Sequence, residues 1–214
     1  MKLYSYFRSS AAYRVRIALN LKGLAYEYVP IHLVRDGGQQ LKPEYRAVNP
    51  DGIVPTLVDG DNVLHQSLAI IEYLEETHPQ PPLLPAAPAD RAFVRSIALQ
   101  VACEIHPLDN LRVLKYLKHE VKAPDAVKDA WYAHWVERGF ESLEKRLAGD
   151  GRVGALCFGD TPTVADLSLV PQVFNARRFK IDMSRYPTIE RIADYAGQID
   201  AFQRAAPAEQ PDAE

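Results

Sequence analysis

The stretch that decides the fold of this chain is Phe7-Arg8-Ser9-Ser10-Ala11-Ala12-Tyr13-Arg14-Val15-Arg16-Ile17-Ala18-Leu19. It follows residues 2–6, whose alternating apolar pattern predicts a strand. Its own spacing predicts a helix over about 11–22 that ends at Gly23. Two serines therefore lie where a strand leads into a helix N-terminus, with Arg8 beside them. Free backbone N–H groups and the positive end of the helix dipole meet there, so the place suits an anion or a thiolate.

The two serines also have a purely structural interpretation. Serine is a favoured N-cap residue with no chemical role. Taken alone, Ser9-Ser10 before an apolar helix is more typical of capping than of catalysis. The rest of the chain has to distinguish these alternatives.

The composition indicates a globular protein and excludes several classes of function. The chain has 214 residues, of which 47% are hydrophobic, so it can form one large domain or two small ones with a real core. The formal charge of −3 and the absence of a Lys/Arg-rich run argue against nucleic-acid binding. No apolar stretch is long enough to span a membrane, and residues 1–8 do not resemble a signal peptide.

The cysteines and histidines predict no metal site. Cys103 and Cys157 lie in no CxxC motif, and we interpret both as small buried apolar residues. The six histidines are scattered along the chain. We therefore expect a reduced, cytoplasmic protein without a metal centre.

Residues 1–79 alternate strand and helix patterns. The predicted strands cover residues 2–6, 26–29, 54–58 and 62–65, and the predicted helices cover about 11–22 and 67–78. This order predicts a small α/β domain with one antiparallel hairpin on an otherwise parallel sheet.

The rest of the chain is predicted to be a linker, an all-α domain and a tail. Four prolines in residues 80–89 indicate a stiff linker, and 90–204 shows only helical patterns. The expected helices cover 90–119 with a kink at Pro107, 124–148, a segment opened by a capping box at Thr163–Asp166, and about 188–202. Trp131, Trp135, Leu143 and Leu147 form a stripe that we expect in the core. Residues 205–214, rich in Ala, Pro and acid, are predicted to be a flexible tail.

This organisation resembles the glutathione transferases over residues 1 to about 202. The family has a thioredoxin-like N-terminal domain followed by an all-α helical domain. The motif Ser9-Ser10-x-x-Tyr13-Arg14-Val15-Arg16-Ile17-Ala18-Leu19 is similar to that of the zeta class. Further matches are Asn49-Pro50, Val54-Pro55, Gln66-Ser67, Asn110-Leu111 and Asn175-Ala176-Arg177-Arg178-Phe179. The chain departs from the class at Ala11, where the class has cysteine, and at Tyr13, where it has tryptophan.

The resemblance implies a homodimeric enzyme with glutathione as cofactor and a small diketo dicarboxylate as substrate. It implies cis–trans isomerisation by reversible thiolate addition, rotation and elimination. Maleylpyruvate, converted to fumarylpyruvate, is the expected substrate, and maleylacetoacetate is the alternative. A transferase that conjugates or dehalogenates small electrophiles, and a binding module without catalysis, stay open.

The thiol of glutathione has to ionise near pH 7 without a general base. A cysteine thiol has a pKa of about 8.5, and one pKa unit corresponds to about 1.4 kcal/mol. A helix N-terminus contributes about 0.3–1 kcal/mol, and one hydroxyl donor to a charged sulfur contributes about 1.5–3 kcal/mol. We expect Ser9 to be that donor, with Ser10 and the backbone N–H of Ala11 nearby. Because position 11 is alanine, no protein thiol can assist there.

The resemblance also assigns the residues that hold glutathione. The backbone of Val54, before a cis Pro55, would pair with the cysteinyl part. Gln66 and Ser67 at the next helix N-terminus would hold the γ-glutamyl carboxylate. The weaker candidates are Gln40 for the glycyl end, His106 for polarising the thiol or holding a water, and Asn110 and Arg112 for further contacts.

Two arginines are expected to bind the substrate carboxylates. Arginine recognises a carboxylate in a bidentate manner. We choose Arg8 because it lies beside the two serines, and Arg178 because it matches the family arginine in the Asn-Ala-x-Arg-Phe pattern. Arg177 occupies a variable position. We expect Arg14 and Arg16 to form structural or interface ion pairs.

Overall fold

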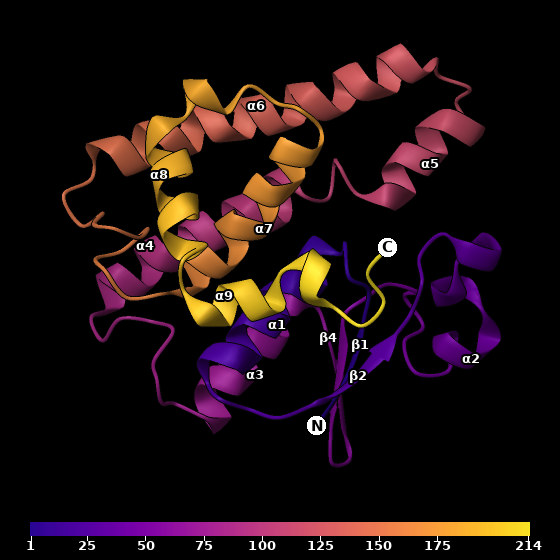
Figure 1. Ribbon diagram of the computed structural model, residues 1–214, viewed down its shortest axis with the longest axis horizontal. Helices are drawn as coiled ribbons and strands as arrows, with labels where there is room; N and C mark the ends of the chain where they lie inside the picture. Colours follow the sequence, from indigo (N-terminus) through magenta and orange to yellow (C-terminus); the bar gives the residue numbers. More distant parts are fainter. The chain divides into compact units, whose positions relative to one another are not determined.

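The computed structural model describes residues 1–214 and divides into two compact units. The first unit contains Met1–Leu83 together with Gly197–Glu214, and the second contains Leu84–Ala196. We call Gly197–Glu214 the returning segment, because it follows the second unit in sequence but belongs to the first (Figure 1).

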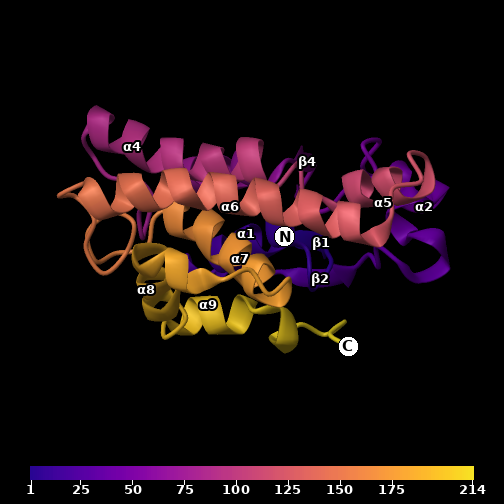
Figure 2. The same ribbon diagram turned by 90° about the horizontal axis from the view of Figure 1, so that it is seen from above.

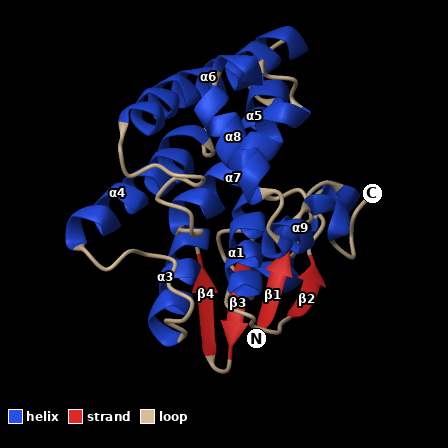
Figure 3. Cartoon of the chain, turned by 60° about the vertical axis from the view of Figure 1, so that its left-hand side comes forward, coloured by secondary structure: helices blue, strands red, loops and turns tan.

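The first unit is built on a four-stranded sheet with strand order β2-β1-β3-β4 (Figure 3). Its elements in chain order are β1 (Lys2–Ser5), α1 (Ser10–Leu21), β2 (Glu27–Pro30), α2 (Pro43–Arg46), β3 (Thr56–Asp59), β4 (Asn62–His65) and α3 (Ser67–Thr77). The expected order of strands and helices is confirmed. The expectation of an otherwise parallel sheet is wrong, because β3 runs antiparallel to β1 as well as to β4. The connection from β2 to β3 contains only short turns and the four-residue α2, so it lacks the long helix that usually joins parallel strands.

Helix α1 forms the core of the first unit. Nine of its residues, from Ser10 to Leu19, are buried, and the helix contacts both α3 and α9 (Asp200–Ala205). The buried positions include Val15, Ile17 and Leu19. A helix covered on so many sides holds its N-terminal residues in a defined place.

Two expected boundaries are wrong. The helical domain ends at Ala196 rather than at residue 204, and residues 205–214 are part of the first unit rather than a tail. The predicted helix over 188–202 is split into α8 (Pro187–Ala196) and α9, because Ile199 has an extended backbone. Beyond α9 the chain forms a short turn at Pro207–Glu209, and the buried Gln210 donates to the carbonyls of Arg204 and Ala206 at 2.9 and 2.8 Å. These tertiary contacts order a stretch whose composition alone is typical of a tail.

The second unit is helical, as expected (Figure 2). Its helices are α4 (Pro88–Leu99), a π-helical turn (Gln100–Ile105), α5 (Leu111–His119), α6 (Asp125–Gly149), α7 (Val164–Arg178) and α8. The expected single helix over 90–119 is wrong, because residues 106–110 are not helical. Pro107 lies inside this break, which agrees with its lack of a backbone N–H.

Three local predictions for the second unit can be compared with the structure. The capping box is confirmed, since the buried Asp166 accepts from the backbone N–H and the hydroxyl of Thr163 at 2.8 and 2.9 Å. The expected stripe on α6 is confirmed at Leu143 and Leu147 and is wrong at Trp131 and Trp135. The buried face is made by Tyr132, Val136, Phe140, Leu143 and Leu147, while both tryptophans are half-buried. Cys157 is buried as expected but Cys103 is exposed.

No helix in the structure is both long and apolar enough to cross a membrane.

Candidate functional site

Ser9 is the N-cap of α1. Its hydroxyl oxygen accepts from the backbone N–H of Ala12 at 3.2 Å, and its carbonyl accepts from that of Tyr13 at 2.8 Å. The capping interpretation is therefore correct, but it does not exclude a chemical role. A serine hydroxyl that accepts one bond can still donate its own hydrogen. Helix geometry also leaves the N–H group of Ala11 without an intrahelical acceptor. The N-terminus of α1 thus offers donors of the kind that a thiolate needs.

The turn before Ser9 is held by the buried Arg16. Its guanidinium donates to the carbonyls of Tyr6 and Phe7 at 3.3 and 3.0 Å, and to the hydroxyl of Ser5 at 3.1 Å. The backbone N–H of Ser9 donates to the Tyr6 carbonyl at 2.9 Å. The expected ion pair of Arg16 is therefore wrong. The buried turn carbonyls need donors, and Arg16 supplies them.

The N-terminus of α3 is a second position whose surroundings suit an anion. Ser67 is the first residue of α3, and its buried hydroxyl accepts from the equally buried guanidinium of Arg14 at 3.3 Å. Gln66 precedes it with φ 67° and ψ 117°, a backbone conformation that costs a residue with a side chain about 1–3 kcal/mol. A cation behind a helix N-terminus suits a carboxylate, and such strain is typical of functional positions.

The loop before β3 presents an unpaired peptide backbone. The Val54–Pro55 bond is cis, as expected. No hydrogen bond within the chain uses the backbone N–H or carbonyl of Val54, although this residue is only 7% exposed. Buried backbone groups are nearly always paired, so this position is suited to an extended peptide ligand.

Two residues that the sequence analysis left without a role support this loop. The hydroxyl of Tyr45 and the amide of Asn49 both donate to the carbonyl of Ile53, at 2.6 and 2.9 Å. Both also contact the hydroxyl of Thr56 at 3.0 Å. The Asn49-Pro50 match to the family was the only sequence signal for this network.

Gln40 and Arg8 occupy different surroundings in the first unit. The buried Gln40 side chain turns into its own loop, where Nε2 donates to the Leu33 carbonyl at 3.4 Å and Oε1 has no partner. Arg8 is exposed, with its guanidinium 4.7 Å from the centre of the Phe7 ring. Arg8 is therefore accessible to a ligand. Gln40 could bind a ligand only through its unpaired Oε1, or after its side chain adopts another rotamer.

Arg178 is the last residue of α7 in the second unit. Its guanidinium lies 4.6 Å from the centre of the Phe179 ring, and that ring stacks on Tyr132 at 3.7 Å. Arg177 instead pairs with Asp194 at 2.6 Å on the exposed surface. The two arginines thus make different contacts. That Arg8 and Arg178 converge on one substrate stays a prediction.

The residues near the start of α5 do not share a helix face. His106 and Asn110 lie in the break between the π-helical turn and α5. Asn110 is the N-cap of α5, and its side chain accepts from the backbone N–H of Arg112 at 3.1 Å. The expectation that His106 and Asn110 face one side of a kinked helix is therefore wrong. The Arg112 side chain is exposed.

Asp109 is a residue that sequence reasoning missed. Its side chain is 7% exposed, and neither carboxylate oxygen has a partner. Burial raises the pKa of Asp109 to about 8. The pKa of the buried Tyr132 is also raised, first by burial and then by the charge of Asp109. An Asp in a Pro-Leu-Asp-Asn stretch is typical of an exposed turn, so no pattern in the sequence signals this burial.

Comparisons with known proteins agree with this fold and site. The family model described as "Glutathione S-transferase, N-terminal domain" matches residues 3–82, and the one described as "Glutathione S-transferase, C-terminal domain" matches residues 125–204. The probable maleylacetoacetate isomerase of Vibrio cholerae is 50% identical over 99% of this chain and 97% of its own length.

Two solved structures superpose on the whole chain. One is a holo structure of maleyl pyruvate isomerase, described as a bacterial glutathione S-transferase of the zeta class, with 49% identity and a TM-score of 0.97. The other is maleylacetoacetate isomerase from Methylobacterium extorquens AM1 with bound malonate and glutathione, with 45% identity and a TM-score of 0.96. Each covers 100% of both chains. The chain therefore belongs to the glutathione S-transferase family, in its zeta class.

Proposed function

We propose that this chain is a glutathione-dependent cis–trans isomerase that converts maleylpyruvate to fumarylpyruvate. The observation that supports this most is the N-terminus of α1, where the Ser9 hydroxyl and first-turn N–H groups offer hydrogen bonds to a thiolate. A relative named for maleylacetoacetate and a relative named for maleylpyruvate are each 50% identical to this chain. Maleylacetoacetate is therefore the second candidate substrate.

The first unit fits a bound glutathione. A tripeptide needs partners for its backbone and for its two carboxylates. The unpaired backbone of Val54 suits the cysteinyl part, and the N-terminus of α3 with Ser67 and the buried Arg14 suits the γ-glutamyl carboxylate. Gln66 has an exposed side chain at the same helix end, and Gln40 has a free amide oxygen for the glycyl end.

The chemistry is divided between cofactor and protein. When bound, glutathione supplies a thiolate that adds to the conjugated double bond, allows rotation and is eliminated again. Ser9 holds this thiol ionised by donating its hydroxyl hydrogen, while the oxygen continues to accept from Ala12. The hydroxyl and the helix dipole together contribute about 2–4 kcal/mol, which exceeds the roughly 2 kcal/mol needed to move a thiol pKa from about 8.5 to about 7. No general base is required.

The substrate carboxylates would be bound by Arg8 and Arg178. The exposed Arg8 guanidinium, on the residue before Ser9, can pair with one carboxylate. Arg178 would hold the other end of the substrate, and its contact with the Phe179 ring limits the positions of its guanidinium. The proposal extends to a homodimer, as family membership suggests, and to a cytoplasmic location. Sedimentation of the purified protein and fractionation of cells would test these two points.

The decisive experiment is an isomerase assay with both substrates, each with and without glutathione. We expect conversion of maleylpyruvate to fumarylpyruvate, at a rate that depends on glutathione, and a constant amount of free thiol during turnover. Consumption of thiol in proportion to product would instead indicate a conjugating transferase. Binding of glutathione without conversion of either substrate would favour a non-catalytic module.

A further inference from the structure

The returning segment binds the turn that precedes Ser9. One carboxylate oxygen of Asp212 accepts from the backbone N–H of Phe7 at 3.2 Å, and the other accepts from the hydroxyl of Tyr28 at 2.6 Å. Tyr28 belongs to β2, beside β1 in the sheet. Asp212 thus links the peptide two residues before Ser9 to the neighbouring strand.

A second link from the returning segment passes through Arg16. The carbonyl of Ala205 accepts from Nε of Arg16 at 3.0 Å. The other end of the same guanidinium donates to the carbonyls of Tyr6 and Phe7. Because a guanidinium is planar, a bond at Nε fixes the direction of its remaining N–H groups. Both backbone groups of Phe7 are therefore held by groups that belong to, or are oriented by, residues 205–212.

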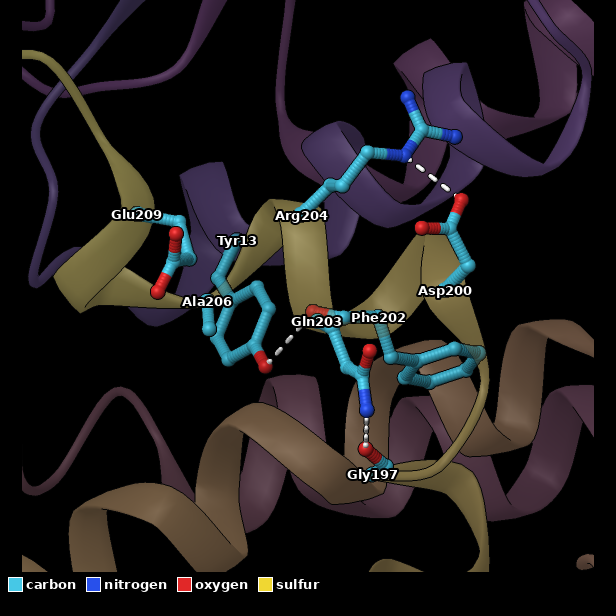
Figure 4. A pocket seen from close by; sticks show the side chains of 8 residues that line it. All are labelled: Tyr13, Gly197, Asp200, Phe202, Gln203, Arg204, Ala206 and Glu209. Atoms are coloured by element: carbon cyan, nitrogen blue, oxygen red, sulfur yellow. Dashed lines mark hydrogen bonds and ion pairs between the residues drawn. The ribbon is translucent and has the colours of Figure 1, made fainter.

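The same segment also packs along α1. The hydroxyl of Tyr13 donates to the carbonyl of Phe202 at 3.4 Å (Figure 4). A cavity of about 520 Å³ lies beside this contact, and it is lined by residues of α1 and the returning segment, among them Tyr13 and Glu209. No residue predicted to bind glutathione or substrate lines it.

A fourth contact of the returning segment reaches the loop that contains Gln40. The carboxylate of Glu214 pairs with the guanidinium of Arg35 and lies 3.3 Å from Nε2 of His32. Nδ1 of His32 in turn accepts from the backbone N–H groups of Val34 and Arg35 at 3.2 and 2.8 Å. The returning segment thus contacts two separate parts of the proposed glutathione site.

We propose that Asp212 is a positioning residue for the proposed thiolate site, acting through the Phe7 peptide on the Ser9 hydroxyl. The inference rests on the proposed function and identifies the residue that positions the Ser9 hydroxyl, the main donor to the thiolate. Small displacements of catalytic groups have large effects on rate, and a hydroxyl bond to sulfur weakens steeply with poor geometry. Without Asp212, the Phe7 N–H loses its acceptor. Of the two side chains that bind the Phe7 backbone, only Arg16 then remains.

The effect of positioning and the effect of charge have opposite signs, which makes the proposal testable. The Asp212 carboxylate is negative, so its charge alone disfavours a thiolate, and removing that charge would lower the pKa of the thiol. Loss of positioning would raise the pKa. For Asp212→Ala we expect the pKa of bound glutathione to rise by about 0.5–1 unit, part of what one hydroxyl donor to a charged sulfur contributes. Asp212→Asn, which keeps an acceptor oxygen of the same size, should restore most of the wild-type value.

The experiment titrates the thiolate absorbance of the protein–glutathione complex against pH, and measures kcat and KM for the isomerase substrate. Glu209→Ala is the matched control, because it removes an exposed carboxylate from the same segment without changing a contact to the turn before Ser9. This variant should behave as wild type. For Asp212→Ala we expect kcat to fall about 3- to 10-fold, in proportion to the pKa change, while the substrate KM stays within about twofold.

An unchanged or lowered thiol pKa in Asp212→Ala would overturn the proposal. If circular dichroism shows that this variant does not fold, Tyr28→Phe replaces it. This variant removes the other donor to Asp212, and it should raise the thiol pKa by a smaller amount. A wild-type value in a folded Tyr28→Phe protein would then overturn the proposal. A wild-type protein that ionises glutathione but converts neither substrate would refute the proposed function and leave the role of Asp212 intact.

Discussion

Replacing Asp109 by Asn should change how the stability of this protein depends on pH. The carboxyl is buried without a hydrogen-bond partner, and burial raises its pKa from the ordinary value of 3.8 to about 8. At pH 7 the native state therefore holds a neutral carboxyl at this position. The unfolded chain holds a carboxylate under the same conditions.

This difference in protonation sets both the sign and the size of the effect. Between about pH 4 and pH 8 the native state binds about one more proton at Asp109 than the unfolded state does. The unfolding free energy of the wild type should therefore fall by up to about 1.4 kcal/mol for each pH unit in this range. The stabilising contribution is complete below the unfolded pKa and is lost as pH rises through the native one. The asparagine of Asp109→Asn has no proton to exchange, so its contribution to the unfolding free energy does not change with pH. From about pH 5 to 7, the unfolding free energy of the variant should therefore rise by about 3 kcal/mol relative to that of the wild type.

Urea denaturation followed by circular dichroism at three pH values measures this difference. The protein concentration must be the same throughout, because any assembly would stabilise the native state. Asp182→Asn is the control. Asp182 is exposed, and hydrogen bonds from Ser184 lower its pKa, so this variant should differ from the wild type by a constant amount over the same range. Parallel curves for Asp109→Asn and the wild type would refute the buried, protonated state of Asp109.

Substitutions at Ser9, Arg178 and Gln66 test the proposed site further. Ser9→Ala should lose the cap as well as the donor, and lower the unfolding free energy by about 1 kcal/mol, whereas Ser9→Gly should keep most of the stability. Both should raise the thiol pKa, and equal activity in wild type and Ser9→Gly would exclude the hydroxyl as donor. Arg178→Ala should raise the KM for the isomerase substrate about 10-fold or more without changing that for glutathione, while Arg177→Ala should change neither. An effect confined to Arg177→Ala would reverse the assignment. Gln66→Gly should relieve the backbone strain and raise the unfolding free energy by about 1 kcal/mol, while calorimetry shows weaker glutathione binding. A loss of stability would show that the φ of 67° is not strained.

The parts of the fold that depend on local signals were predictable from the sequence. Capping at Ser9 and the box at Thr163–Asp166 depend on residues three apart, and both are present in the structure. On α6 the prediction of buried side chains holds for Leu143 and Leu147 but fails for Trp131 and Trp135, because Tyr132 and Val136 make the buried face in that half of the helix. Helical spacing alone does not specify which neighbours a helix meets.

The candidate site was predictable to a similar extent. Ser9 and Ser67 could be placed at helix N-termini from the sequence. They remain candidates because the anion-binding property of such a terminus belongs to the backbone. The supporting contacts were not, because they join distant parts of the chain. Asp212 binds Phe7 across 205 residues of sequence, and Arg14 reaches Ser67 across 53. The burial of Asp109 likewise depends on tertiary packing.

The discontinuity of the first unit has a consequence for how the protein is made. During synthesis Met1–Leu83 leaves the ribosome first, but Ala205 and Asp212, which hold the turn before Ser9, are added only after the second unit. Nascent chains that lack the last residues can form the sheet, yet they lack the acceptors for the Phe7 N–H and for Nε of Arg16. Premature release of the chain would therefore yield a protein that resembles the full-length one in secondary structure but lacks part of the support of the proposed glutathione site.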